Sequence, residues 1–115
     1  MVYRKDLKLH SLKFPVTRQP VRVYVDKQRT PWWDVNATRK IIGNPDTFYF
    51  GRLDDGRTTD SEHLYIITNG SPVHAVNLVK LLEVLRRSDS PHAPAFLDWT
   101  LYTVLPDLRR DPDYN

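Results

Sequence analysis

The sequence predicts an α+β fold in which a small antiparallel sheet of two hairpins packs with about three helices. The hairpins are predicted by short alternating or aromatic segments around polar turns, within residues 21–33 and 47–68. The helices are predicted by apolar residues at helical spacing in residues 35–42, 73–88 and 93–108. A length of 115 residues suits one such domain with its own hydrophobic core.

The first hairpin and the first helix follow one another directly. Val21–Val25 alternates apolar and polar residues, as in a strand with one buried face, and the polar segment Asp26–Thr30 predicts a turn. Residues 31–33 resume an extended strand, and Asp34 is a favourable N-cap for a helix over Val35–Ile42. The expected inward residues of this helix are Val35, Thr38, Ile41 and Ile42.

The second hairpin is expected further along the chain. Thr47–Phe50 is aromatic and strand-like, residues 54–56 (Asp-Asp-Gly) form a turn signal, and His63–Thr68 is the returning strand. Residues 69–72 (Asn-Gly-Ser-Pro) then predict a helix start, because serine is a good cap and proline suits the first helical position. We expect this helix to extend over residues 73–88. Its expected inner stripe is Ala75, Leu78, Val79, Leu82 and Leu85, and it is widened by Val76, Leu81 and Val84.

The last quarter of the chain predicts a buried helix. Apolar residues recur at three-residue steps from Ala93 to Leu105, and a second apolar row runs from Leu97 to Leu108. A helix that is apolar on two sides is normally buried between neighbours, and Pro106 marks a stop or kink in it. The residues expected in the core are Trp33, Phe50, Leu82, Phe96, Trp99 and Leu105.

The positive charge of the chain is concentrated near its start. The net charge is +3, and residues 1–20 hold five basic side chains against one acidic one. We therefore expect a basic N-terminal arm over residues 1–20, which either meets phosphate or is a solvated tail, and a single domain over residues 21–115. The chain has no cysteine, no apolar run of membrane-spanning length and no apolar signal-peptide core.

No arrangement in the sequence indicates catalysis. The four histidines are scattered without the paired spacing of metal ligands, and no Gly-x-Ser-x-Gly or phosphate-cradling glycine loop occurs. We therefore predict no enzyme activity, no cofactor and no metal. An unrecognised nuclease or hydrolase is the most distant alternative.

The end of the chain resembles the end of the Bro-N domain of phages and large DNA viruses. The pattern is a small residue, an aromatic residue and a tryptophan at three-residue steps, then Val-Leu-Pro, Leu-Arg-Arg and a tyrosine. Two departures are Pro112, where the family usually has glycine, and residues 77–81, where a Gly-Leu-Tyr-like stretch is missing. The matching residues are Ala93, Phe96, Trp99, Val104, Leu105, Pro106, Leu108, Arg109, Arg110 and Tyr114.

This resemblance implies a stand-alone viral DNA-binding protein, related in role to KilA-N and antirepressor modules, that regulates transcription in the cytoplasm of the infected host. The sequence does not decide whether the protein forms a homodimer. The alternative is an adaptor that binds and inhibits a host protein, without a DNA role. A contiguous positive face that joins the second hairpin, Arg39 and Arg110 would favour DNA, whereas an exposed apolar patch would favour a protein partner. The candidate DNA-binding residues are Lys13, Arg18, Arg39, Lys40, Arg52, Arg57, Arg109 and Arg110.

Overall fold

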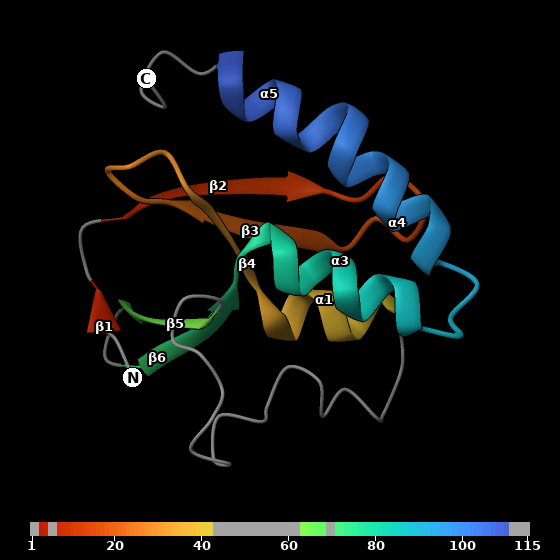
Figure 1. Cartoon of the computed structure of the whole chain (residues 1–115), viewed down its shortest axis with the longest axis horizontal. Coiled ribbons are helices and arrows are strands. Elements are labelled where there is room, and N and C mark those ends of the chain that lie inside the picture. Colours follow the sequence, from red (N-terminus) through yellow and green to blue (C-terminus); the bar gives the residue numbers. More distant parts are fainter. Residues whose placement is uncertain (1–2, 5–6, 43–62, 69–70, 111–115) are drawn as a thin grey trace.

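The protein forms an α+β domain, as predicted, in which one curled sheet packs with helices (Figure 1). The computed structural model describes residues 3–4, 7–42, 63–68 and 71–110. Within these ranges the sheet has six strands, in the order β1-β5-β6-β4-β3-β2. The strands are β1 Tyr3–Arg4, β2 Lys8–Lys13, β3 Pro20–Val25, β4 Pro31–Asp34, β5 His63–Thr68 and β6 Ser71–Val76. The helical elements are α1 Val35–Ile42, α3 Leu78–Arg87, α4 Ala93–Trp99, η1 Thr100–Val104 and α5 Leu105–Arg110.

The β3–β4 hairpin has the predicted position, and Asp26 closes its turn. One carboxylate oxygen of Asp26 accepts hydrogen bonds from the backbone N–H groups of Gln28 (3.0 Å) and Thr30 (2.8 Å). The other accepts the indole N–H of Trp32 at 3.1 Å. Asp26 is only 8% exposed. Burial of a carboxylate is unfavourable unless hydrogen bonds replace those it makes with water, and these three bonds do so. Its charge is therefore committed to the turn.

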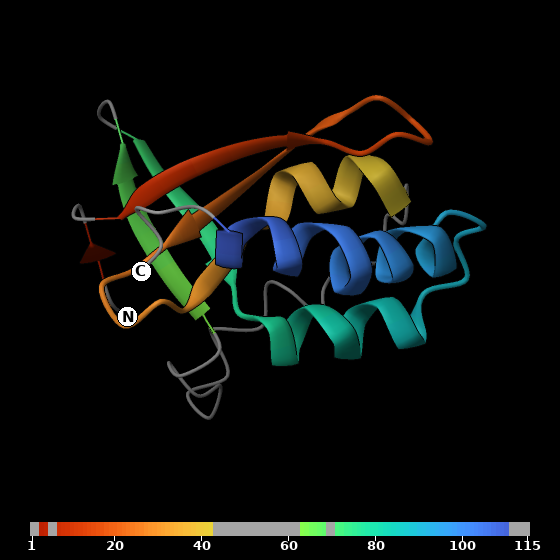
Figure 2. The same cartoon turned by 90° about the horizontal axis from the view of Figure 1, so that it is seen from above.

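The two faces of the sheet contribute to two separate apolar clusters. The larger cluster lies between the sheet and the helices, and Figure 2 shows the helices gathered on one side of the strands. Trp33, Phe14 and Phe96 are the largest fully buried side chains, and all three lie in this cluster. Consecutive side chains of a strand point to opposite faces of the sheet, so Trp32, which precedes Trp33, lies on the other face. The smaller cluster consists of Tyr24, Trp32, Ile66 and Ala75.

The expectation of a basic arm outside the domain is wrong for the residues that form β2. This strand pairs antiparallel with β3 along its whole length, from Lys8 opposite Val25 to Lys13 opposite Pro20. Phe14, which follows it, is fully buried, and its ring centroid lies 5.2 Å from those of Phe96 and Trp99. The alternation of Leu7 and Leu9 with Lys8 and His10 hints at a short strand here, and the lysines of β2 suit its place at the sheet edge, where charged side chains are common.

The second hairpin differs from the prediction. Strand β5 pairs with β6, from His63 opposite Val76 to Thr68 opposite Ser71. The Asn-Gly pair between these strands is itself a strong hairpin sequence, and it outweighs the Ser-Pro helix signal that follows. Because Ala75 and Val76 also pair with β4, the end of β6 is held as a strand from both sides. The expected strand Thr47–Phe50, including the core candidate Phe50, lies outside the described residues.

Helix α3 consequently starts later than predicted, and only part of its predicted inner surface is buried in the core. Asn77 caps it by accepting a hydrogen bond from the backbone N–H of Lys80 at 3.1 Å. Val79, predicted to face inward, is 61% exposed. Leu82 is only half-buried and does not belong to the core cluster, which corrects its assignment to the core. The buried residues of α3 are Leu81, Val84 and Leu85.

The C-terminal helix is continuous but changes its winding. Between α4 and α5 lies the π-helical segment η1, in which the backbone N–H of Leu105 donates to the carbonyl of Thr100, five residues earlier. Pro106 follows directly, and its missing N–H and its ring are poorly accommodated in a regular helix. Phe96 is fully buried as expected, while Trp99 and Leu105 are half-buried and pack against the core. No helix within the described ranges is both long and apolar enough to cross a membrane.

Candidate functional site

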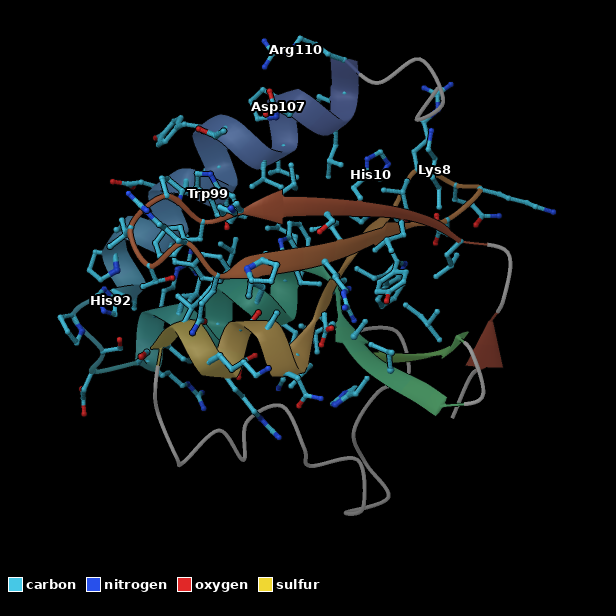
Figure 3. The ribbon with its side chains drawn as sticks, turned by 180° about the vertical axis from the view of Figure 1, so that it is seen from behind. Lys8, His10, His92, Trp99, Asp107 and Arg110 are labelled. Atoms are coloured by element: carbon cyan, nitrogen blue, oxygen red, sulfur yellow. The ribbon has the colours of Figure 1, made fainter. Side chains whose placement is uncertain are left out.

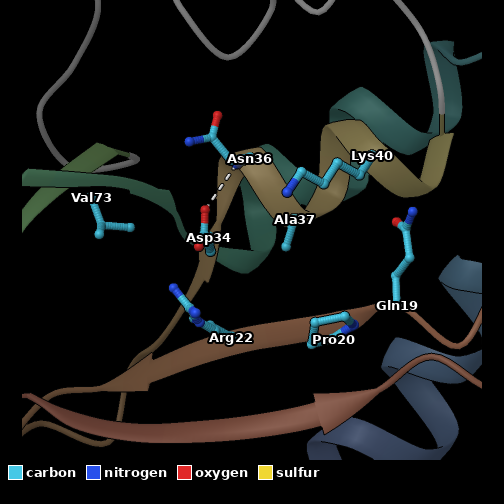
Figure 4. Close-up of a pocket in the computed structure, with 8 residues that line it drawn as sticks. All are labelled: Gln19, Pro20, Arg22, Asp34, Asn36, Ala37, Lys40 and Val73. Atoms are coloured by element: carbon cyan, nitrogen blue, oxygen red, sulfur yellow. Dashed lines mark hydrogen bonds between the residues drawn. The ribbon is translucent and has the colours of Figure 1, made fainter.

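A cleft of about 400 Å³ lies between strand β3 and helix α1 (Figure 4). One wall comes from β3 and the residue before it, and the other from α1 and the end of β4. Two basic side chains line it, Arg22 from β3 and Lys40 from α1. The remaining lining residues are Gln19, Pro20, Asp34, Asn36, Ala37 and Val73.

Local structure explains why these side chains reach the cleft. Arg22 and Pro20 lie on the face of β3 opposite to the buried Val21 and Val23, because side chains alternate along a strand. Asn36 and Lys40 are four residues apart in α1 and therefore share one side of it, whereas the buried residues of α1 lie on another. These buried residues are Val35, Thr38, Ile41 and Ile42, as predicted.

Asp34 connects the cleft to the first turn of α1. One of its carboxylate oxygens accepts the backbone N–H of Asn36 at 2.9 Å, which confirms the predicted capping role. Its backbone carbonyl accepts the hydroxyl of Thr38 at 3.1 Å. The residue is 6% exposed, so the only carboxylate among the lining residues is largely enclosed and already hydrogen-bonded.

Tyr24 lies next to Arg22 and Asp34 without lining the cleft. Burial raises the pKa of its phenol, and the negative charge of Asp34 raises it further. Arg22 opposes both effects through its charge and through a hydrogen bond to the phenolic oxygen. The guanidinium of Arg22 is thus hydrogen-bonded to the neutral phenol of Tyr24.

Gln19 bounds the cleft from the connection between β2 and β3. Its backbone is fixed, because its carbonyl accepts the N–H of Phe14 at 3.0 Å and its own N–H donates to the hydroxyl of Thr17 at 3.4 Å. Its side-chain oxygen Oε1 is buried and has no hydrogen-bond partner among the described residues. A buried amide oxygen without a donor is costly, so this acceptor favours a ligand that supplies one.

The structure groups only some of the predicted basic residues. Lys40 lines the cleft, and Lys13 lies on the same face of the sheet as Pro20, its partner across the strands. Arg18 is exposed in the β2–β3 connection and has a positive φ of 63°. Arg39 is half-buried, and its Nε has no partner in the described part of the chain. Arg52 and Arg57 lie outside the described residues.

Arg109 and Arg110 lie away from the cleft, at the end of α5 on the opposite side of the molecule (Figure 1). Arg110 forms an ion pair with Asp107 one turn earlier (Figure 3). Arg109 lines a second groove, of about 280 Å³. Within the described residues, Arg39 and Arg110 therefore do not lie on one contiguous positive face, which would have favoured DNA. The other residues of the second groove are Thr30, Pro31, Asn77, Leu78, Val79 and Leu105.

Sequence reasoning missed Arg22, the arginine of the cleft. The alternation around it indicated a solvent-facing strand position, which is correct, but nothing in the pattern shows that α1 lies beside this position. The available signal was the clustering of charge. Residues 7–42 contain eight lysines and arginines but only two acidic residues, Asp26 and Asp34. Both acidic residues are buried and hydrogen-bonded.

Comparison of the chain with protein-family models, curated proteins and solved structures finds no match. No group of three or more potential metal-ligating side chains occurs among the described residues. The chemistry of the cleft and of the surface around it is therefore the basis on which a function can be inferred.

Proposed function

We propose that the protein binds DNA through the surface formed by β2, β3 and α1, and that it regulates transcription in the manner of an antirepressor-type phage protein. The main support is the charge of this surface, where Arg22 and Lys40 line the cleft and the one lining carboxylate among the described residues, that of Asp34, is buried and hydrogen-bonded. A positively charged surface of this kind attracts phosphate. The resemblance of residues 93–114 to the end of the Bro-N domain supports the same class of function.

Four cations form the proposed interface. Arg22 and Lys40 flank the cleft, Lys13 shares the face of β3, and Arg18 stands in the connection beside Gln19. Arginine can grip a phosphate with its planar fork, and lysine acts as a point charge. Phosphate contacts of this kind set affinity and register on the duplex, while base contacts set the choice of sequence.

A salt titration of duplex affinity tests this proposal. Affinity should fall linearly on a log–log scale, and the double variant Arg22→Ala/Lys40→Ala should reduce the slope by about 0.9 for each phosphate that it no longer neutralises. The matched control is Arg86→Ala/Arg109→Ala, which removes two exposed arginines from α3 and α5 and should leave most of the slope. A folded wild-type protein that binds no duplex at low salt would exclude the proposal.

The adaptor remains the second candidate because of the groove beside α3 and α5. Leu78, Leu105 and Pro31 line it, and Val79 adds an apolar side chain that is 61% exposed. An exposed apolar surface of this kind is a feature of protein-binding sites. Affinity capture from host lysate with and without nuclease discriminates the two candidates, since a partner bridged by DNA is released on nuclease treatment.

A further inference from the structure

We propose that the cleft between β3 and α1 holds a single unpaired nucleotide. Its phosphate would lie against Arg22 and Lys40, and its base would lie against the apolar surface of Pro20, Ala37 and Val73. This inference rests on the proposed function and deepens it, because it names the unit of DNA that the site receives.

The hollow itself is the first support. Phosphate contacts to an intact duplex require only a positive surface, and a cavity adds nothing to them. A volume of about 400 Å³ lies within the range of about 300–1,000 Å³ that is typical of small-ligand sites. An unstacked nucleotide is the part of DNA that can fill such a space, and extruding it costs least where it is already unpaired.

The positions of the charges are the second support. Arg22 and Lys40 approach the cleft from opposite walls, one on a strand and one on a helix (Figure 4). An anion between them would meet both cations, which would otherwise repel each other across the cleft. Asp34 partly offsets the positive charge, but its carboxylate already accepts the N–H of Asn36.

The orphaned acceptor in the cleft wall is the third support. Gln19 lines the cleft together with Lys40 (Figure 4), and its buried Oε1 lacks a donor among the described residues. The exocyclic amino groups of adenine, cytosine and guanine are donors that could satisfy it, whereas the only ring donor of thymine, its N3–H, lies between two carbonyl oxygens that would repel the amide oxygen. We therefore expect a preference for amino-bearing bases over thymine.

Titration calorimetry with mononucleotides on the full chain tests the inference without duplex DNA. Deoxyadenosine monophosphate should bind at least tenfold more tightly than ribose 5-phosphate, inorganic phosphate or deoxyadenosine, because only the nucleotide fills both parts of the cleft. Ala37→Trp keeps both cations but fills the cleft, and it should weaken nucleotide binding tenfold or more. Gln19→Leu should reduce the preference for adenine over thymine. It provides a second test of the cleft if the tryptophan variant does not fold.

The second arm uses DNA. A duplex with one unpaired adenine should bind more tightly than the matched intact duplex, and Ala37→Trp should abolish this difference. Equal binding of phosphate and nucleotide, or an unchanged preference in both cleft variants, would overturn the inference. Nucleotide binding without any duplex binding would instead remove the proposed function and leave the nucleotide site in place.

Discussion

Tyr24 shows how a single residue links the smaller apolar cluster to the basic cleft. Its ring packs with Trp32, Ile66 and Ala75, while its phenolic oxygen accepts a hydrogen bond from Arg22. The bond holds the guanidinium without removing its charge, because the phenol is neutral. Arg22 is thereby positioned at the cleft, and its strength as a cation is preserved.

The raised pKa of the Tyr24 phenol predicts a pH dependence of stability. The folded protein retains the phenolic proton at a pH where the unfolded chain, with a pKa of 10.0, releases it. This contribution is fully present below pH 10 and is lost as the pH rises above it. Thermal melts of Tyr24→Phe should therefore fall less steeply than wild type between about pH 9.5 and 11. Tyr102→Phe, which removes a 75% exposed phenol, is the control; equal slopes for wild type and Tyr24→Phe would contradict the expectation.

At the residue scale, the candidate site was only partly predictable. Lys40 and the capping role of Asp34 follow from local patterns, because a helix cap and a helix surface depend on neighbours in sequence. The pairing of Arg22 with Lys40 across a cleft depends on how α1 packs beside β3, which no local pattern contains. Arg109 and Arg110 were grouped with the others by their charge, their place at a helix end and the resemblance to the Bro-N pattern, but their positions on α5 separate them from the cleft.

Among the elements, those specified by one consistent signal were predicted, and those with competing signals were not. Helix α1 has a cap, a periodic stripe and a preceding turn that all agree, and its bounds are as predicted. The segment that forms β6 contains both an Asn-Gly hairpin signal and a Ser-Pro helix signal. Pairing with two neighbouring strands, which is a tertiary effect, decided the outcome.

The π-helical segment η1 provides a prediction at the element scale. The hydroxyl of Thr100 is fully buried there and has no hydrogen-bond partner among the described residues. Thr100→Val preserves the shape and removes the unsatisfied group, so stability to urea should be unchanged or rise by up to about 1 kcal/mol. Thr103→Val, at an exposed position of the same segment, is the control. A loss of more than about 1 kcal/mol would show that the hydroxyl stabilises the π turn.

For the whole molecule, the main difference from the sequence prediction is where the domain begins. Charge composition grouped residues 1–20 as an arm, although Phe14 lies at the centre of the aromatic packing with Phe96 and Trp99. A basic strand at a sheet edge and a basic tail have the same composition. The alternation of Leu7 and Leu9 with Lys8 and His10 hints at a strand, but the pairing of β2 with β3 is a property of the complete fold.

Deletion of residues 1–18 should therefore abolish cooperative folding rather than only weaken DNA binding. It removes β2 and Phe14, and Phe14→Ala alone should cost about 3–5 kcal/mol. Circular dichroism melts of the deletion, of Phe14→Ala and of the exposed control Val16→Ala measure this. A truncated chain that melts like the intact protein would show that β2 is dispensable.

The sheet is joined at its middle by a short contact between distant parts of the chain. Strand β4 meets β6 through only two paired positions, Trp33 opposite Val76 and Asp34 opposite Ala75. Most of each side can form from nearby residues, because β2, β3 and β4 are consecutive and β5 and β6 form a hairpin, while β1 joins β5 from the start of the chain. Joining the two halves closes a loop of about forty residues, and this loop closure costs more conformational entropy than pairing strands that are close in sequence. Because contacts between distant parts of the chain slow folding, we expect attachment of β4 to β6 to be among the slow steps by which the sheet is completed.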